Sequence, residues 1–235
     1  MLQNRENDSM LGFRINRRER RVPADLVARF HDLPAANVSD VMARMTAGGA
    51  RLRPMHGGGV LAGPALTVKT RPGDNLMVHK AIDIALPGDV IVVDAGGDLT
   101  TAIIGEIMVS HAAARGVAGI VINGAIRDSA ALRAGRFPVF AAGVTHRGPY
   151  KDGPGEINVA IALDGMVIEP GDLILGDDDG LVAAPFDHAE AICAAAAAKQ
   201  ASEEEMLAAI RAGHGPDRAW VDETLKRLGC TFDAD

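Results

Sequence analysis

The apolar residues of this chain form two kinds of run, which alternate along its middle. Short continuous runs are typical of strands buried on both faces of a sheet, and they occupy Val90–Val93, Gly119–Asn123 and Pro138–Phe140. Apolar residues at helical spacing lie between and around them. The expected helices cover Pro23–Phe30, Asn37–Met45, Gly73–Ala85, Thr100–Arg115, Ser129–Ala134, Asp187–Ala212 and Asp217–Leu228. This order of elements predicts an α/β fold.

Turn residues refine that outline. Pro23 is expected near the first position of its helix, and Asn37 or Ser39 at the N-cap of the next. The segment Val60–Thr70 is predicted as an extended strand, in which Leu66 and Val68 alternate with Thr67 and Lys69. Short strands are also expected at Ile157–Leu163, Met166–Ile168, Leu173–Leu175 and Leu181–Ala184. The turn Pro87-Gly88-Asp89 recurs as Pro170-Gly171-Asp172, so one turn-plus-strand arrangement is used twice.

The pattern divides the chain into three segments. Residues 1–22 form a charged N-terminal arm, residues 23–186 the α/β core, and residues 187–235 a C-terminal helical extension. The arginine-rich arm is expected to be solvated or to clasp a neighbouring subunit. The Ala-rich helix that follows the core suggests subunit packing, although a helix folded against its own domain is equally permitted.

Composition narrows the class of protein. Of 235 residues, 48% are apolar but only 3% aromatic, so Ala, Val, Ile and Leu are expected to fill the core. The net charge of −7 and the pI of about 5.5 argue against nucleic acid or an anionic membrane as the main partner. Cys193 and Cys230 belong to no metal-ligand pattern and are expected to be reduced. No signal-peptide pattern and no apolar run of about 20 residues occurs, so a cytoplasmic protein is expected.

The candidate chemistry lies in one stretch, from Gly105 to Asp128. A helix start at Gly105-Glu106 offers free backbone N–H groups to a small carboxylate. The pair Arg127-Asp128 follows a buried strand, where ligands bind in α/β sheets. Asp128 can alternatively cap the next helix, and Arg127 can simply pair with Asp128 or Glu106. Together with Asp98, these acids without Cys or His ligands suit a hard cation such as Mg²⁺ or Mn²⁺.

At these residues the chain resembles the RraA-like family, which includes the metal-dependent 4-hydroxy-4-methyl-2-oxoglutarate/4-carboxy-4-hydroxy-2-oxoadipate aldolases. These class II pyruvate aldolases carry an acidic residue, twenty further residues and then Arg-Asp, and Glu106, residues 107–126 and Arg127-Asp128 reproduce that spacing. The resemblance extends from about Asn37 to Pro185. It includes Gly63-Pro64-Ala65, Gly88–Asp94, Gly124–Asp128, Pro170-Gly171-Asp172 and Asp177–Gly180.

The resemblance implies a single-domain β/β/α sandwich that assembles as homotrimers or as dimers of trimers. It implies that Asp128 holds the Mg²⁺ and that Arg127 contacts the keto oxygen or carboxylate of a 2-oxo acid substrate. The backbone N–H groups of four residues would receive the pyruvate carboxylate, and these are Gly105, Glu106, Ile107 and Met108. Glu106 would orient a water beside the metal, although the aldolases usually carry Asp there. An acid from a neighbouring C-terminal segment would complete the site, with Glu203, Glu204 and Glu205 as candidates.

The implied activity is retro-aldol cleavage of a 4-hydroxy-2-oxo acid to pyruvate and a second 2-oxo acid, with oxaloacetate decarboxylation through the same intermediate. Two alternatives stay open. Some RraA-like proteins are binding regulators of an RNA-degrading enzyme, and a related lyase acting on a different 2-oxo acid is the other. Because the chain retains Arg127-Asp128, the enzyme is favoured over the regulator.

Overall fold

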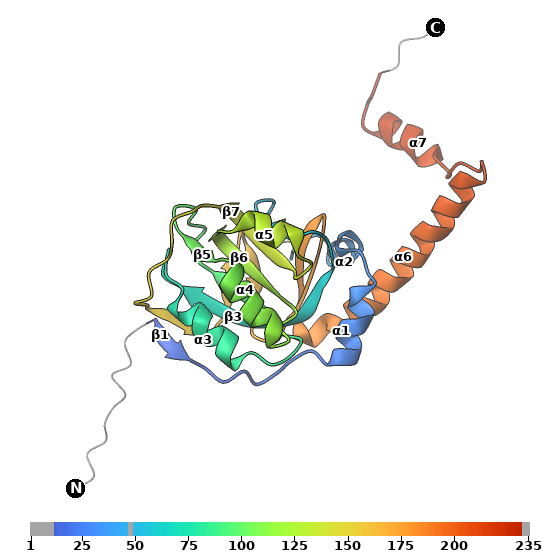
Figure 1. The fold of residues 1–235 in the computed structure, drawn as a ribbon. Helices are drawn as coiled ribbons and strands as arrows, with labels where there is room; N and C mark the ends of the chain where they lie inside the picture. Colours follow the sequence, from blue (N-terminus) through green and yellow to red (C-terminus); the bar gives the residue numbers. More distant parts are fainter. Residues whose placement is uncertain (1–11, 47–48, 232–235) are drawn as a thin grey trace. The chain divides into compact units, whose positions relative to one another are not determined.

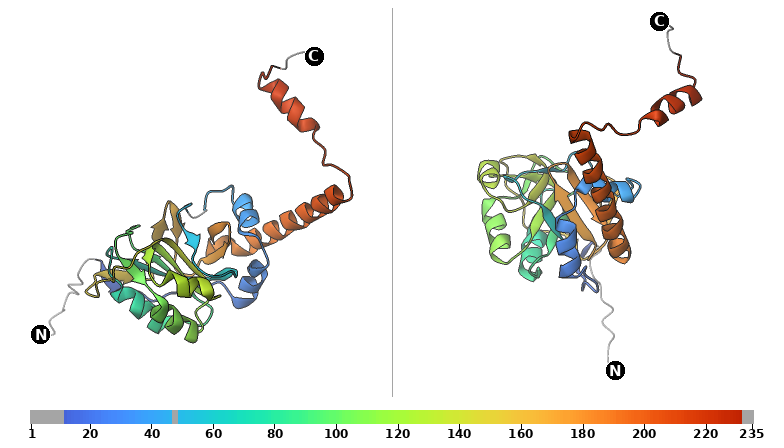
Figure 2. Two further views of the ribbon diagram at one scale, coloured as in Figure 1. Left: turned by 45° about the horizontal axis from the view of Figure 1, so that its top comes forward. Right: turned by 90° about the vertical axis from the view of Figure 1, so that its right-hand side faces the viewer.

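The computed structural model describes residues 12–46 and 49–231, and it divides at Ala196/Ala197 into two compact units (Figures 1 and 2). The α/β prediction is confirmed for the first unit. Its strands are β1 (Phe13–Ile15), β2 (Arg53–Pro54), β3 (Leu61–Thr70), β4 (Val90–Asp94), β5 (Ala102–Ile104), β6 (Gly119–Ile126), β7 (Val139–Val144), β8 (Gly155–Ile157), β9 (Ile161–Leu163), β10 (Met166–Ile168), β11 (Leu173–Asp177) and β12 (Gly180–Ala184). The helices of the chain are α1 (Ala24–His31), α2 (Ala35–Val41), α3 (Leu76–Ile84), α4 (Glu106–Ala114), α5 (Ser129–Ala134), a 3₁₀ turn (Phe186–His188), α6 (Ala189–Arg211) and α7 (Ala219–Arg227).

A mixed sheet with the strand order β1-β8-β3-β4-β6-β7-β2 forms the centre of the first unit. Strands β3, β4, β6 and β7 are mutually parallel, whereas β8 runs antiparallel to β3 and β2 runs antiparallel to β7. Strand β11 pairs antiparallel with both β3 and β12, which folds a second layer against the first. The domain boundaries expected from the sequence stay a prediction.

Both faces of the parallel strands are buried, which explains why their sequences are continuously apolar. Along β4, Ile91 and Val93 belong to the cluster under α3 and α4, the helices in front of the sheet in Figure 1. The intervening Val90 and Val92 pack on the other face, against residues of β9 to β12. A third apolar cluster joins α1, α2 and the first turns of α6 to β11 and β12.

Three predicted elements differ from the structure. The strand predicted over Ile157–Leu163 is interrupted, because β8 ends at Ile157 and β9 begins only at Ile161. The helix predicted over Thr100–Arg115 is wrong at its start, because Ala102–Ile104 is a buried strand, β5, beside β6, and α4 begins only at Glu106. The alternation in β3 does not place one face in solvent. Thr67 is fully buried, because its hydroxyl donates to the Val159 carbonyl oxygen at 2.7 Å.

Two predicted helix starts also change. Pro23 is the N-cap of α1 and lies one residue before its first helical position. Asn37 and Ser39 lie inside α2, whose N-cap is Pro34. The recurring turn is confirmed: Asp89 and Asp172 each accept a hydrogen bond from the backbone N–H three residues earlier, at 2.9 and 2.8 Å.

The described part of the N-terminal arm lies against its own core. Strand β1 pairs in parallel with β8. Arg20 forms ion pairs with Glu169 and Asp187. Most side chains of residues 13–21 are nevertheless exposed, so the segment is solvated on its outer side. A clasp on a neighbouring subunit stays a prediction. Residues 1–11 lie outside the described residues.

A buried ion pair anchors this segment. Arg18 Nη2 lies 2.9 Å from Asp89 Oδ2, and the Asp89 side chain is completely buried. Arg21 Nε lies 3.1 Å from Asp89 Oδ1, but that oxygen has no hydrogen bond of acceptable geometry among the described residues. We rank Arg18 as the stronger partner, because its contact is both an ion pair and a hydrogen bond.

Replacing Arg18 with Met is expected to destabilise the protein by about 2 kcal/mol. The loss stays below the ~3–5 kcal/mol typical of a broken buried pair, because Arg21 and the Leu86 N–H still face the carboxylate. Urea unfolding at neutral pH measures the change, and Arg17→Met on the exposed neighbouring residue is the matched control. Equal stability of the two variants would contradict this role for Arg18.

The second unit contains the C-terminal part of α6 and the helix α7. Its described apolar side chains are largely exposed, among them Met206, Leu207, Ile210 and Trp220. Lys199 Nζ and Glu203 Oε1 form an ion pair at 2.8 Å within α6. In the described residues of the whole chain, no helix combines the length and the hydropathy that crossing a membrane requires.

Candidate functional site

The β5–α4–β6 unit brings the two ends of the candidate stretch together. Strands β5 and β6 are parallel, with Ile104 opposite Ile126, and the Arg127 N–H donates to the Ile104 carbonyl oxygen at 2.9 Å. Gly105 and Glu106 therefore lie beside Arg127 and Asp128. Residues 107–126 contain the rest of α4 and the strand β6, which ends beside the end of β5.

Asp128 caps α4, the helix before its own strand. It occupies the N-cap position of α5 in the left-handed conformation, with φ of 56°, but its side chain makes no capping bond there. Instead, Oδ2 accepts a hydrogen bond from the Glu106 N–H at 3.0 Å. The alternative that Asp128 serves only as a cap for Ser129–Ala134 is therefore wrong. Asp128 Oδ1 has no partner among the described residues.

Gly105 allows this close approach. A Cβ at position 105 would lie 2.3 Å from Asp128 Oδ2 and 2.9 Å from Arg127 Cγ. The backbone of Gly105 is extended, with φ of −149°, so its requirement for glycine is steric. A glycine at the N-cap supplies no capping side chain, which leaves that role to Asp128.

Arg127 is held loosely. Its Nε lies 3.8 Å from Asp128 Oδ2, with no hydrogen bond between the two side chains, and both are about two-fifths exposed. No ion pair joins Arg127 to Glu106 within the described part of the chain. Arg127 and Asp128 thus form only a long ion pair. The guanidinium therefore keeps N–H donors that can bind a ligand.

A small cavity of about 30 Å³ lies at the start of α4. Four of the residues predicted from the sequence line it: Gly105, Ile107, Met108 and Arg127. The N–H groups of Ile107 and Met108 lie in the first turn of α4, where a helix cannot satisfy them internally. The remaining lining residues are Asn75, Ile103, Ile104 and Pro149. Asn75 and Pro149 were not expected from the sequence.

Glu106 faces a different space. Its backbone N–H is occupied by Asp128, and the residue lines a groove of about 190 Å³ between α4 and α5. That groove is lined by Glu106, Val109, Ser110, Ala113, Ala131, Leu132, Gly135, Arg136 and Phe137. The candidate site thus has a cavity on the Arg127 side and a groove on the Glu106 side.

Asp98 does not contribute to this cluster. Its carboxylate accepts hydrogen bonds from Thr100 N, Thr100 Oγ1 and Thr101 N, which order its own loop. Partial desolvation acts to raise the pKa of Asp98. The hydrogen bonds, above all the one from the Thr100 hydroxyl, outweigh it and hold this pKa below its usual value. The carboxylate is therefore satisfied as a loop cap.

The donor set restricts the kind of metal that fits. Among residues 12–46 and 49–231, no group of three or more His, Cys, Asp or Glu side chains converges on a metal-sized space. Mg²⁺ commonly uses only one or two protein carboxylates and completes its shell with waters and substrate oxygens. Asp128, which keeps one free oxygen next to Arg127 and the start of α4, fits that pattern. A closed Zn²⁺ site would need more ligands.

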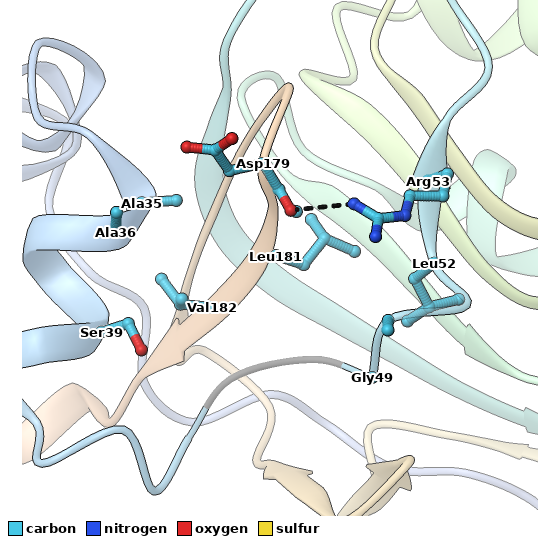
Figure 3. A pocket seen from close by; sticks show the side chains of 11 residues that line it. Ala35, Ala36, Ser39, Gly49, Leu52, Arg53, Asp179, Leu181 and Val182 are labelled. Atoms are coloured by element: carbon cyan, nitrogen blue, oxygen red, sulfur yellow. Dashed lines mark hydrogen bonds between the residues drawn. The ribbon is translucent and has the colours of Figure 1, made fainter.

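A second pocket, of about 180 Å³, lies away from this cluster, between α2, β2 and the β11–β12 hairpin. Figure 3 shows that Arg53 points toward the Asp179 backbone carbonyl, which accepts its hydrogen bond at 3.1 Å, whereas the Asp179 carboxylate points away. The hairpin acids Asp177 and Asp179 form a turn closed by a 3.0 Å hydrogen bond. Asp177 ends β11 and Asp179 lies in the turn that follows, so both acids belong to the structure of the hairpin.

The fold and the arrangement of this site define an RraA-type protein. The RraA-like family model, described as Aldolase/RraA, matches residues 35–183, which is more than half of the chain. The chain belongs to this family. Over 201 residues it is 40% identical to a Halalkalibacterium halodurans protein named "Putative 4-hydroxy-4-methyl-2-oxoglutarate aldolase", covering 86% of this chain and 96% of that protein.

Solved structures agree with the family. The RNA-processing inhibitor RraA from Thermus thermophilis is 31% identical with a TM-score of 0.61, over 66% of this chain and 93% of that one. An uncharacterized protein from Pseudomonas syringae pv. tomato is 27% identical with a TM-score of 0.75, over 82% and 91% of the two chains.

Proposed function

We propose that this chain is a divalent-metal-dependent aldolase that cleaves a 4-hydroxy-2-oxo acid to pyruvate and a second 2-oxo acid. The proposal rests above all on one observation: the free N–H groups at the start of α4, the Arg127 guanidinium and the Asp128 carboxylate meet at one sheet edge. The name of the 40% identical relative supports the same activity, with 4-hydroxy-4-methyl-2-oxoglutarate as a candidate substrate.

Each group has a distinct role in the proposed reaction. The N–H groups of Ile107 and Met108 bind the substrate carboxylate, because a helix start favours an anion. Arg127 donates to the keto oxygen, where negative charge develops as the bond between C3 and C4 breaks. Asp128 would hold Mg²⁺ or Mn²⁺ through its free oxygen. The Glu106 carboxylate receives the proton of the C4 hydroxyl through a water, and the same proton is returned to C3 to complete pyruvate.

A bound divalent metal would add positive charge beside the oxygen that becomes anionic during cleavage. Oxaloacetate is a second substrate in this proposal, because loss of its C4 carboxylate leaves the same negative charge for Arg127 to stabilise. We also propose that the protein works in the cytoplasm as a homotrimer or a dimer of trimers, in which a C-terminal acid of a neighbouring chain completes the site.

Pyruvate release from 4-hydroxy-4-methyl-2-oxoglutarate and from oxaloacetate, measured with Mg²⁺ and after EDTA treatment, tests the function. Arg127→Ala is expected to lower kcat about 10²-fold, the usual cost of removing one donor to a developing anion. The control Arg17→Ala removes an exposed arginine far along the chain and should keep full turnover. Turnover that survives both EDTA and Arg127→Ala would contradict the proposal.

Binding regulation of an RNA-degrading enzyme is the second candidate, and its support is the 31% identical RNA-processing inhibitor. In that case Arg127→Ala should leave partner binding unchanged, and wild-type protein should release no pyruvate. A related lyase would instead release pyruvate, or another 2-oxo acid, from a different substrate and would still lose turnover in Arg127→Ala.

A further inference from the structure

Asn75 carries a buried oxygen that the protein itself does not satisfy. The side chain is 2% exposed, and its Nδ2 donates to the Ile103 carbonyl oxygen at 2.9 Å and lies 3.2 Å from Met108 Sδ. These contacts fix the orientation of the amide, because a flipped amide would place two oxygens against each other at Ile103. Oδ1 is consequently left over, and no donor among the described residues reaches it.

An unsatisfied buried acceptor is uncommon and calls for an explanation. More than about nine in ten buried polar groups have a hydrogen-bond partner. Asn75 is also a wall of the cavity that Gly105, Met108 and Arg127 line at the start of α4. At about 30 Å³ that cavity has room for one water-sized group, such as a hydroxyl or a water molecule. The oxygen that lacks a hydrogen-bond donor and the space that could hold one are therefore found at the same residue, Asn75.

The other polar groups around this cavity are donors. The N–H groups of the first turn of α4 and the Arg127 guanidinium attract oxygens that carry negative charge. Asn75 Oδ1 repels such an oxygen and attracts an O–H. A ligand that matches these groups must therefore place a hydroxyl in the cavity and offer a carboxylate close to it, at the helix start and Arg127.

We propose that Asn75 is a ligand-binding residue of this site, and that its Oδ1 accepts a hydrogen bond from an O–H of the bound molecule. The ligand class is a small hydroxy carboxylate; a ligand without a hydroxyl is accompanied by a water in the same place. The inference rests on the proposed function, because it names a specificity residue of that site. It makes Asn75 the group that distinguishes a hydroxy acid from a plain oxo acid.

The chain contains a matched control in Asn158. Its Nδ2 also donates to a backbone oxygen, that of Asn16 at 2.8 Å, and its Oδ1 likewise has no partner among the described residues. Asn158 is 9% exposed and is absent from the lining of the cavity at α4. Because its φ is 57°, Asn158→Gly removes the amide without backbone strain.

Calorimetric titration of the full chain with glycolate and with oxalate, both in the presence of Mg²⁺, tests the proposal. The two ligands have similar sizes, and only glycolate carries a hydroxyl. Asn75→Ala should weaken glycolate binding about tenfold, the worth of one typical hydrogen bond, and Asn158→Gly should leave it unchanged. A loss larger for glycolate than for oxalate identifies the ligand hydroxyl as the donor, whereas equal loss for both ligands would overturn that assignment.

Unchanged binding in Asn75→Ala, equal losses in Asn75→Ala and Asn158→Gly, or no binding of either ligand to wild-type protein would overturn the proposal. If Asn75→Ala does not fold, a wild-type crystal with glycolate decides, because the glycolate hydroxyl must lie about 2.7–2.8 Å from Oδ1. Neither measurement needs turnover. Absence of aldolase activity would thus count against the proposed function, while the binding result separately decides the role of Asn75.

Discussion

Asp128→Asn is expected to lower kcat of the proposed aldolase by about 10³-fold with little change in the fold. Asn tolerates the left-handed φ of 56° at this position, and its carbonyl oxygen can still accept the hydrogen bond from Glu106 N–H. What the substitution removes is the negative charge that would hold Mg²⁺, and with it several kcal/mol of transition-state stabilisation. The change therefore separates the role of Asp128 in chemistry from its role as a helix cap.

Steady-state kinetics over a range of Mg²⁺ concentrations, together with thermal unfolding, measures both roles. Asp178→Asn is the matched control, since Asp178 is an exposed acid in the β11–β12 turn. The variant and the control should unfold within a few degrees of each other, whereas only Asp128→Asn should lose turnover and the Mg²⁺ dependence. Near-normal turnover in Asp128→Asn would rule out this residue as the metal ligand.

Gly105→Ala is expected to lower kcat on the order of 10³-fold, through geometry alone. The added methyl group would lie 2.3 Å from Asp128 Oδ2 and 2.9 Å from Arg127 Cγ, so both side chains must move. A displacement of about 1 Å at one catalytic group can already cost about 10²-fold, and here two groups shift together. The forced contact should also destabilise the fold by about 1–3 kcal/mol.

Gly215→Ala provides the control for this substitution. Gly215 likewise does not have a positive φ, and a Cβ there would meet no atom within 4 Å. Kinetic measurements on both variants, with urea unfolding alongside, separate lost positioning from lost stability. If Gly105→Ala turned over at the wild-type rate, the close approach of β6 to the start of α4 would have no functional role.

Much of this site could be predicted from the sequence, because its residues lie on two ends of one local unit. The buried run that became β6, the helix start after Gly105 and the spacing to Arg127 are all visible along the chain. Strand β5 is not visible in the sequence, because only Gly105 and Glu106 separate its three apolar residues from the apolar pattern of α4. A run that short cannot be assigned to a strand or a helix by periodicity.

Asn75 could not be predicted, because its role depends on contacts distant in sequence. Within Gly73-Asp74-Asn75 the polar residues suggested a helix N-terminus, and Asp74 does cap α3 by accepting a 2.9 Å hydrogen bond from the Leu76 N–H. Asn75 instead reaches β5, 28 residues further along the chain. The direction of Glu106 toward the α4–α5 groove was also not foreseeable, since it depends on how two helices pack.

The hydrogen bond from the Glu106 N–H to Asp128 makes the length of α4 a constraint on how this protein can change. Inserting or deleting one residue in α4 turns its two ends by about 100° relative to each other and shifts them by about 1.5 Å. Either change would separate the helix start from the strand end that caps it. We therefore expect relatives with this site to accommodate length variation in surface loops, with the segment from Gly105 to Asp128 kept at constant length.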